Sequence, residues 1–274
     1  MRGLLVIAAA CAAVLVVTLA PVTAGADTFA DTWLRGASSV AVNDDATALF
    51  INPAGLGMYE GSNSYTSLSM AGKDVVGVSA ASKLGPIGLG YSRHYLWEPG
   101  SDAEAGLRPA DDAVDVYYAG LALGDPRSFS VGFDYRWFRP QFGEERKTGT
   151  WDMGAMYRPS SVLSFGAAIR NMSEPDVLGD DGCSCGTKTT YVAGLAVRPM
   201  GNTLTLMADA SAERDQDLAD AVYTAGVEAE VADGLIFRGS LQSYPDGDDR
   251  GQEFSAGLWF NMRHVGVGAD YRSF

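Results

Sequence analysis

Apolar and polar residues alternate over most of this chain, and that alternation constrains the fold more than any other feature. From residue 62 onward the sequence divides into segments of about 10 to 13 residues, separated by Gly, Pro, Asp and Asn. Within 127–140, for example, Phe133 and Tyr135 alternate with Asp134 and Arg136. Successive side chains of a β-strand point to opposite faces, so each segment predicts a strand with one apolar face and one polar or small face.

Alternation alone does not distinguish a membrane barrel from a soluble β-sandwich, which is the alternative fold. Three further features favour a transmembrane antiparallel β-barrel: segments long enough to cross a bilayer when tilted, Tyr and Trp near segment ends, and connections of alternating length. The short connections are 124–126, 159–161, 199–202 and 232–234, and the longer acidic ones are 98–111, 141–147, 173–186, 213–220 and 245–250. We therefore predict an all-β fold, an outer-membrane barrel of 13–14 strands.

The number of predicted strands is odd. The segments are 62–71, 73–83, 86–97, 112–123, 127–140, 148–158, 162–172, 187–198, 202–212, 219–231, 234–244, 251–261 and 264–274. Bacterial single-chain barrels normally have an even number of strands. In addition, Phe274 is out of phase with the apolar face that carries Val267 and Tyr271. A missed strand, a bulge that shifts the phase, or an absent closing strand would each explain this.

The first 26 residues have the composition of a secretory signal peptide. Arg2 precedes an apolar run from Leu4 to Ala20, and Ala24-Gly25-Ala26 is a small-residue cleavage site, so the mature chain is expected to begin at Asp27. No later stretch is long and apolar enough for a membrane helix. The chain has 34 acidic and 20 basic residues, for a net charge of −14, which argues against nucleic acid as a partner.

The sequence offers few residues for catalysis or metal binding. Outside the predicted signal peptide, the cysteines of the chain are Cys183 and Cys185. They are interpreted as a small disulfide or idle thiols, since two thiols alone do not complete a zinc site. The chain has two histidines, His94 and His264, and no HExxH motif or nucleophile elbow. His94 falls on the lumen-facing row, where a bond to a neighbour is the favoured role. We therefore expect neither an enzyme, nor a cofactor, nor a metal site.

Charged residues of both signs fall on the rows predicted to face the lumen. They are Asp134, Arg136, Asp152, Arg170, Asp209, Glu228, Glu230, Arg238, Asp270 and Arg272. We expect these residues to pair across strands or to hold a plug in place, with a water path as the alternative. Acidic residues, including Glu174 and Asp176, are concentrated in the long connections. We interpret these connections as solvated loops that lie next to membrane lipid and are bridged to lipopolysaccharide by divalent ions.

Residues 27–60 lack the alternation and lie between the signal peptide and the first predicted strand. Asn43 and Asp44 are suitable N-caps for a helical turn that starts at Asp45, and Asn52 is suited to cap a second turn with Pro53 at its first position. The segment also carries apolar residues that need a surface to pack against, and the barrel lumen provides one. The predicted organisation is a signal peptide (1–26), a hatch (27–60) and an outer-membrane barrel (61–274).

The stretch from Gly36 to Leu56, with Asn43-Asp44-Asp45 and Asn52-Pro53-Ala54-Gly55 at its centre, carries a family resemblance. It resembles the N-terminal signature of the outer-membrane transporters of long-chain fatty acids and aromatic hydrocarbons (FadL-like), and more closely the shorter PorV/PorQ-type members. The resemblance implies a hatch that plugs a fourteen-stranded barrel. Residues 268–272 resemble the second-to-last strand of PorV-type proteins, which is followed by one more strand.

This resemblance implies two alternative functions. The first is passive passage of small hydrophobic compounds, with Phe50, Ile51 and Leu56 as the apolar surface of the hatch. In the transporters a kink in the third strand opens a lateral gap, which the resemblance places at Pro86, Gly88 and Gly90. The second is a non-transporting scaffold that binds exported proteins, as PorV-type partners of type IX secretion do, and the short connections of this chain favour it.

Overall fold

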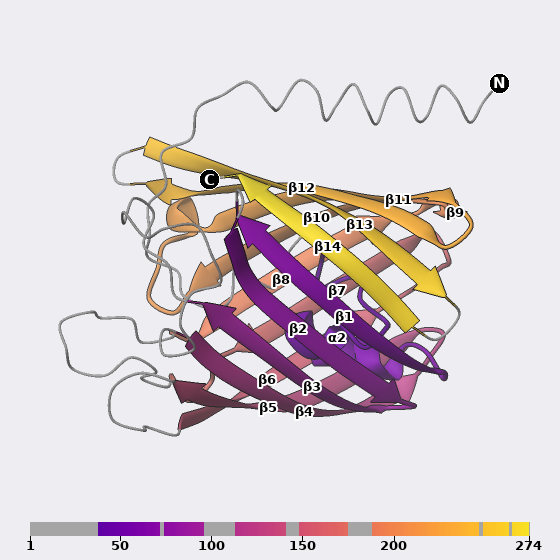
Figure 1. Cartoon of the computed structure of the whole chain (residues 1–274), viewed down its shortest axis with the longest axis horizontal. Helices are drawn as coiled ribbons and strands as arrows, with labels where there is room; N and C mark the ends of the chain where they lie inside the picture. The colour runs from indigo at the N-terminus through magenta and orange to yellow at the C-terminus, as the bar shows by residue number, and fades with distance from the viewer. Residues whose placement is uncertain are drawn as a thin grey trace.

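A computed structural model of the chain describes residues 38–71, 74–95, 113–140, 148–174, 188–246, 249–262 and 265–273. The predicted signal peptide (1–26), the first part of the predicted hatch (27–37), Cys183, Cys185, His264 and Phe274 lie outside these residues. The described strands form a closed barrel (Figure 1). Within the same residues, no helix is long and apolar enough to cross a bilayer.

Thirteen strands of the described chain make up the barrel wall. They are β1 (Ser62–Ala71), β2 (Asp74–Leu84), β3 (Ile87–Tyr95), β4 (Ala113–Asp125), β5 (Phe129–Pro140), β6 (Thr148–Tyr157), β7 (Leu163–Arg170), β8 (Thr190–Val197), β10 (Leu204–Glu213), β11 (Val222–Ala232), β12 (Leu235–Asp246), β13 (Asp249–Met262) and β14 (Val265–Ser273). The short β9 (Pro199–Asn202) extends the hairpin between β8 and β10. Each predicted segment corresponds to one barrel strand, which confirms the predicted barrel.

The alternation of side chains is inside out relative to a soluble protein. On β5, Phe133 and Trp137 are 48% and 47% exposed on the outer face, whereas Asp134 and Arg136 are buried in the lumen at 1% and 4%. Large apolar residues are exposed in the same way on most other strands. Lipid solvates such a surface, and only a closed barrel or a helix satisfies its backbone groups there. The fold is therefore that of a membrane-spanning β-barrel.

The barrel closes through one parallel pair of strands. Every other ladder among the described strands is antiparallel, and an odd number of such strands leaves the first and last running in the same direction. β1 pairs with β14 from Ser64 with Val265 to Ala71 with Arg272, without a shift in register. The thirteen described strands thus close the barrel through a parallel joint, so the odd number of predicted segments requires neither a missed strand nor an absent closing strand.

The two ends of the barrel differ in the length of their connections. At one end are short turns, including Gly85-Pro86 and Asp233-Gly234, and Gly85 and Gly234 adopt the positive φ values that glycine tolerates. At the other end are the longer connections, such as those between β3 and β4 and between β7 and β8. In outer-membrane barrels short turns are periplasmic and long loops are external, which predicts the orientation of this barrel.

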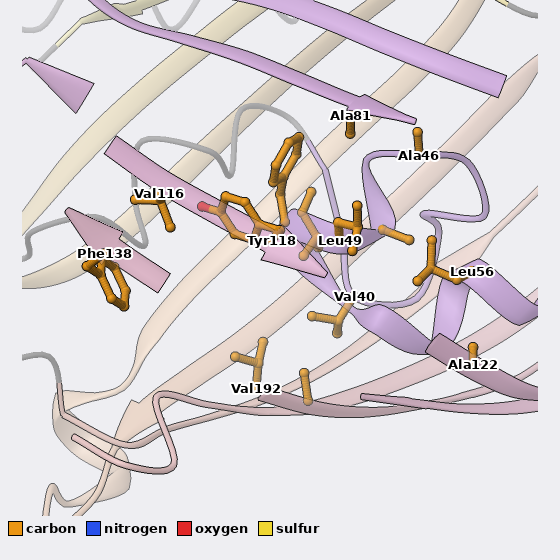
Figure 2. Close-up of a cluster of buried hydrophobic side chains, with 14 of the residues drawn as sticks. Val40, Ala46, Leu49, Leu56, Ala81, Val116, Tyr118, Ala122, Phe138 and Val192 are labelled. Atoms are coloured by element: carbon orange, nitrogen blue, oxygen red, sulfur yellow. The ribbon is translucent and has the colours of Figure 1, made fainter. Parts of the chain in front are cut away.

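Residues 38–60 lie within the barrel and contain two short helices. These are α2 (Ala48–Ile51) and the 3-10 helix η1 (Pro53–Gly57), and we call residues 38–60 the hatch. The 3-10 helix η1 packs against β4, β5 and β6, and apolar side chains of the hatch form buried clusters with residues of β2, β4 to β8 and β10 (Figure 2). The core of the molecule is thus formed between the hatch and the inner face of the barrel wall.

Engineered cysteines test the parallel closure. Thr66 and Val267 are direct partners on β1 and β14, and neighbouring strands lie about 4.8 Å apart, within the range that a disulfide spans. In a Cys183→Ser, Cys185→Ser background, we expect Thr66→Cys with Val267→Cys to form a disulfide on mild oxidation. Thr66→Cys with Leu258→Cys, which lies one strand farther away on β13, is the matched control and should not crosslink. A folded barrel in which neither pair crosslinks would contradict this closure.

Candidate functional site

The second helical turn of the hatch forms as predicted. Asn52 precedes η1 and its side chain accepts a hydrogen bond from Ala54 N at 3.1 Å, with Pro53 at the first position. Asn52 Nδ2 donates to the carbonyl oxygens of Val40 at 2.7 Å and Ala155 at 3.2 Å. This fully buried amide therefore joins both halves of the hatch to β6.

The first turn is capped differently from the prediction. α2 begins at Ala48, its N-cap is Thr47, and Thr47 makes no side-chain capping bond. Asn43 instead donates from Nδ2 to Thr47 Oγ1 at 2.6 Å, and Asp45 accepts from Thr47 N at 2.8 Å. The predicted caps at Asn43 and Asp44 were wrong, because these side chains bind a hydroxyl of the turn and a barrel residue. The helix is only four residues long and depends on packing.

A track of glycines on the inner faces of β3 to β8 lies against the hatch. Direct cross-strand partners among them are Gly88 with Gly120, Gly132 with Gly154, and Gly166 with Gly194. A Cβ at Gly132 would lie 2.3 Å from the carbonyl oxygen of Pro53, and one at Gly166 would lie 2.0 Å from that of Val40. These distances are too short for any side chain, so glycine lets the hatch backbone approach the barrel backbone directly. We call these six residues the glycine track.

Side chains of the barrel bond to the N-terminal part of the hatch. Asp209 on β10 accepts from Val40 N at 3.0 Å and from Ser39 Oγ at 2.6 Å. Ser164 on β7 donates to the carbonyl oxygen of Ala41 at 2.7 Å. Backbone groups of the hatch that lack a partner within a helix or sheet are thus paired with the wall, as burial requires.

Two basic residues near the short-turn end hold the acidic part of the hatch. Arg158, which follows β6, forms an ion pair with Asp44 at 2.8 Å and donates to the carbonyl oxygen of Val42 at 3.2 Å. Lys83 on β2 donates from Nζ to the carbonyl oxygen of Asp44 at 3.0 Å. Asp44 therefore connects the hatch to β2 and β6, which is a role that the capping prediction missed.

Two further bonds extend the attachment around the barrel. Asn63 on β1 accepts from Ala46 N at 2.8 Å, and Arg170 on β7 donates to the carbonyl oxygen of Ile51. Hydrogen bonds of this kind contribute roughly 0.5 to 1.5 kcal/mol each. The hatch is thereby bonded to strands on several sides of the lumen.

An apolar inner wall extends from the hatch towards the long connections. The ring of Phe50 meets that of Tyr118 edge to face, with centroids 4.9 Å apart. Val116 and Phe138, on β4 and β5, belong to the same buried cluster and are each 1% exposed (Figure 2). We call Val114, Val116, Tyr118 and Phe138 the apolar inner wall. Barrel lumens are usually polar, so an apolar stretch of wall in this position is distinctive.

The opposite side of the lumen carries a charged and aromatic cluster. Arg238 on β12 bonds to Glu228 on β11 at 2.5 Å and lies over the ring of Trp259, 4.6 Å from its centroid. Trp259 Nε1 donates to Tyr65 OH at 3.4 Å, and the Tyr65 ring lies 6.4 Å from that of Phe50. The cluster thus connects β11, β12, β13 and β1 to the hatch.

The residues predicted to form a substrate path divide into two groups. Phe50, Ile51 and Leu56 are buried in the hatch core, and the nearest atoms to Gly88 and Gly90 are side-chain atoms of this core. Pro86 lies in the turn between β2 and β3, and the ladder between these strands is unbroken to Leu84 with Ile87. The structure brings Gly88 and Gly90 to the hatch and leaves Pro86 outside it, so β3 is not kinked at Pro86.

Several of the predicted lumen charges pair across strands or hold the hatch. Arg136 forms an ion pair with Asp152 at 2.7 Å and donates to Asn171 Oδ1 at 2.7 Å. Arg238 pairs with Glu228, as described above, and Asp209 holds the hatch. The structural role that we expected for these charges is confirmed for these residues. The structure does not describe the side chains of Asp270 and Arg272.

His94 is bonded to a neighbour, as expected for a lumen histidine. Its Nε2 lies 2.8 Å from Ser92 Oγ, which also lies 3.2 Å from Tyr118 OH. Ser92 is fully buried, so no substrate reaches its hydroxyl in this state. The described residues contain no group of three or more side chains suited to hold a metal ion.

Glu174 is one of the acidic residues of the long connections that the structure describes; most of these acidic residues lie outside the described part of the chain. It accepts from Thr189 N at 3.3 Å and pairs with Arg214 at 3.6 Å. Hydrogen bonds from Thr189, together with the charge of Arg214, hold the pKa of Glu174 below its ordinary value of 4.5. Two neighbouring connections are thus joined above the barrel wall.

Comparison with known proteins adds a structural likeness but no family. No protein-family model and no curated protein matches the chain. Among solved structures, the chain is similar to a triple mutant of the porin of Rh. blastica, at 17% sequence identity and a TM-score of 0.37. The match covers 72% of this chain and 55% of the porin chain, so this chain spans about half the porin's length. Functional inference therefore rests on the geometry of this barrel.

Replacing Asn52 with Asp tests the central amide of the hatch. Asn52→Asp keeps the size of the side chain but turns a carboxylate oxygen towards the carbonyl oxygens of Val40 and Ala155. An uncompensated buried charge costs about 3 to 5 kcal/mol, so we expect the hatch to leave its seat while the barrel stays folded. The readouts are the urea concentration at which Val40→Cys reacts with a maleimide, and heat-modifiable migration of the barrel. Unchanged protection of Val40→Cys would contradict this role of Asn52.

Proposed function

We propose that the protein is an outer-membrane barrel that admits small apolar compounds through its lumen by passive passage. The observation that carries the proposal is the apolar inner wall, which extends from the long connections to Phe50 of the hatch. Burial of apolar surface contributes about 25 cal/mol per Å², so this wall favours an apolar solute. A polar solute would lose hydration along the same wall without gaining hydrogen bonds.

Movement of the hatch is the gate in this proposal. The side chains of Phe50, Ile51 and Leu56 fill the space next to the apolar inner wall. Their displacement would uncover Gly88 and Gly90 and extend the apolar surface across β3. The resemblance of Gly36–Leu56 to hatch segments of fatty-acid and hydrocarbon transporters supports this assignment.

A second candidate function is a scaffold that binds exported proteins at the outer membrane. The observation that favours it is the attachment of the hatch, which bonds to β1, β2, β6, β7 and β10. A hatch fixed at so many points suits a closed barrel that presents a rigid surface. Under this alternative the barrel passes no solute, and an exported protein crosslinks to its long connections.

Uptake of a hydrophobic tracer separates the two candidates. The protein is reconstituted in vesicles that contain lipopolysaccharide, and accumulation of an apolar fluorescent tracer is compared with that in protein-free vesicles. We expect faster uptake with protein, and no increase for a polar dye of similar size. Equal rates in protein-containing and protein-free vesicles would overturn passage.

A disulfide between hatch and wall tests the gate. A Cβ at Gly88 would lie 2.9 Å from Leu49 Cγ, close to the roughly 3 Å that separates Cβ of one half-cystine from sulfur of the other. We expect Gly88→Cys with Leu49→Cys, in the cysteine-free background, to lower tracer uptake to the protein-free rate when oxidised. Reduction should restore it, and Leu49→Cys alone, which keeps Gly88, is the matched control. Undiminished uptake by the oxidised pair would overturn the hatch as gate.

A further inference from the structure

A row of charged side chains crosses the outer face of the barrel near the long connections. Arg93 and Asp115 are direct partners on β3 and β4, and Asp115 is also the direct partner of Arg139 on β5. All three alternate with lumen-facing residues, so they point outward. Two guanidinium groups thus flank one carboxylate across three neighbouring strands.

Asp115 fixes the position of Arg93 in this row. Arg93 donates from Nε to Asp115 Oδ1 at 2.8 Å and from a terminal nitrogen to Oδ2 at 3.1 Å. Tyr91 OH also donates to Asp115 Oδ1, at 2.7 Å. Asp115 is buried, whereas the Arg93 side chain is 25% exposed and Arg139 is exposed. The paired fork of Arg93 is therefore pre-organised at the surface, and the row carries a net charge of +1.

Aromatic side chains form the next outward row, two residues closer to the middle of the barrel. Tyr91 and Tyr117 are direct partners with ring centroids 5.5 Å apart, and Tyr117 and Trp137 are direct partners at 6.4 Å. Below them the outer face is apolar, with Leu121 and Phe133. This order of charged, aromatic and apolar rows follows the order of head group, interface and acyl chain in a membrane.

We propose that this row binds the phosphate of a phosphorylated lipid in the outer leaflet. Arg93 and Arg139 offer guanidinium groups at head-group level, where they form charge-assisted bonds with a phosphate. Tyr117 and Trp137 support the lipid at the interface, and its acyl chains cover the apolar rows below. The long connections place the row on the external side. This inference rests on membrane insertion and not on the passage of apolar compounds.

Binding of lipid A with and without its phosphates tests the proposal. The protein in detergent, with a chelator present to remove divalent ions, is titrated with phosphorylated or dephosphorylated lipid A, and bound lipid is counted by native mass spectrometry. We expect wild type to bind the phosphorylated form roughly tenfold more tightly, as expected for loss of one charge-assisted bond. Arg93→Gln with Arg139→Gln should bind both forms equally. Arg127→Gln, which removes an exposed arginine at the short-turn end, is the matched control and should keep the preference.

Each other outcome overturns the proposal. If wild type binds the two lipids equally, the phosphate has no role in binding. If Arg127→Gln loses the preference for the phosphorylated lipid, that preference comes from the overall charge of the protein. Inorganic phosphate that competes at the same concentration as lipid A identifies a site for the ion instead of the lipid. Heat-modifiable migration confirms that each variant is folded. If the double variant does not fold, Arg139→Gln leaves the pair of Arg93 and Asp115 intact, and an unchanged preference there overturns the proposal.

Discussion

Direct contact between two backbones determines how this barrel is filled. The carbonyl groups of Val40 and Pro53 approach the inner faces of β7 and β5 so closely that a Cβ atom on the wall would collide with them. Glycines at these points let the hatch backbone lie directly against the strand backbones, and the other contacts of the hatch depend on this close approach. The bonds of Asn52, Asp209 and Ser164 are possible only because the hatch backbone is within reach of the wall.

The filled lumen has two chemically different sides. Towards β4 and β5 it is apolar, with Tyr118 and Phe138 in one cluster with the hatch, whereas towards β11 to β13 it carries Arg238 and Trp259. Ion pairs within the wall, such as Arg136 with Asp152 and Arg238 with Glu228, neutralise charges that the alternation places inside. This arrangement differs from an aqueous pore, in which polar side chains line an open path. An apolar solute and a hatch with an apolar face compete for the same surface, which is the physical basis of the proposed gate.

Much of the barrel followed from the sequence because the physical rules are local. Alternation such as that from Phe129 to Trp137 specifies a strand and its two faces, and Gly85 and Gly234 mark turns where φ is positive. The parallel closure could not be predicted from such rules. It follows from the total number of strands, and pairing of β1 with β14 joins opposite ends of the chain.

The site was less predictable, since it depends on which wall residues meet the hatch. The cap at Asn52 was found from its neighbour Pro53, whereas Asn43 and Asp44 bind groups that no local pattern identifies. The resemblance assigned Gly88 and Gly90 to a kinked third strand, although glycines on the lumen-facing rows of successive strands are a signal that the sequence contains. Arg158 follows the end of a strand, and the alternation alone does not direct it to Asp44.

The most direct measurement is maleimide labelling of Val40→Cys, a fully buried hatch position, in a Gly132→Ala barrel that lacks Cys183 and Cys185. A single Cβ at residue 132 should unseat the hatch, so labelling is expected to be fast while heat-modifiable migration is retained. Gly239→Ala is the matched control, because its Cβ meets neighbouring atoms only at 3.4 Å or more, and it should leave Val40→Cys protected. Equal protection in the Gly132→Ala and Gly239→Ala barrels would contradict the claim that the glycine track seats the hatch.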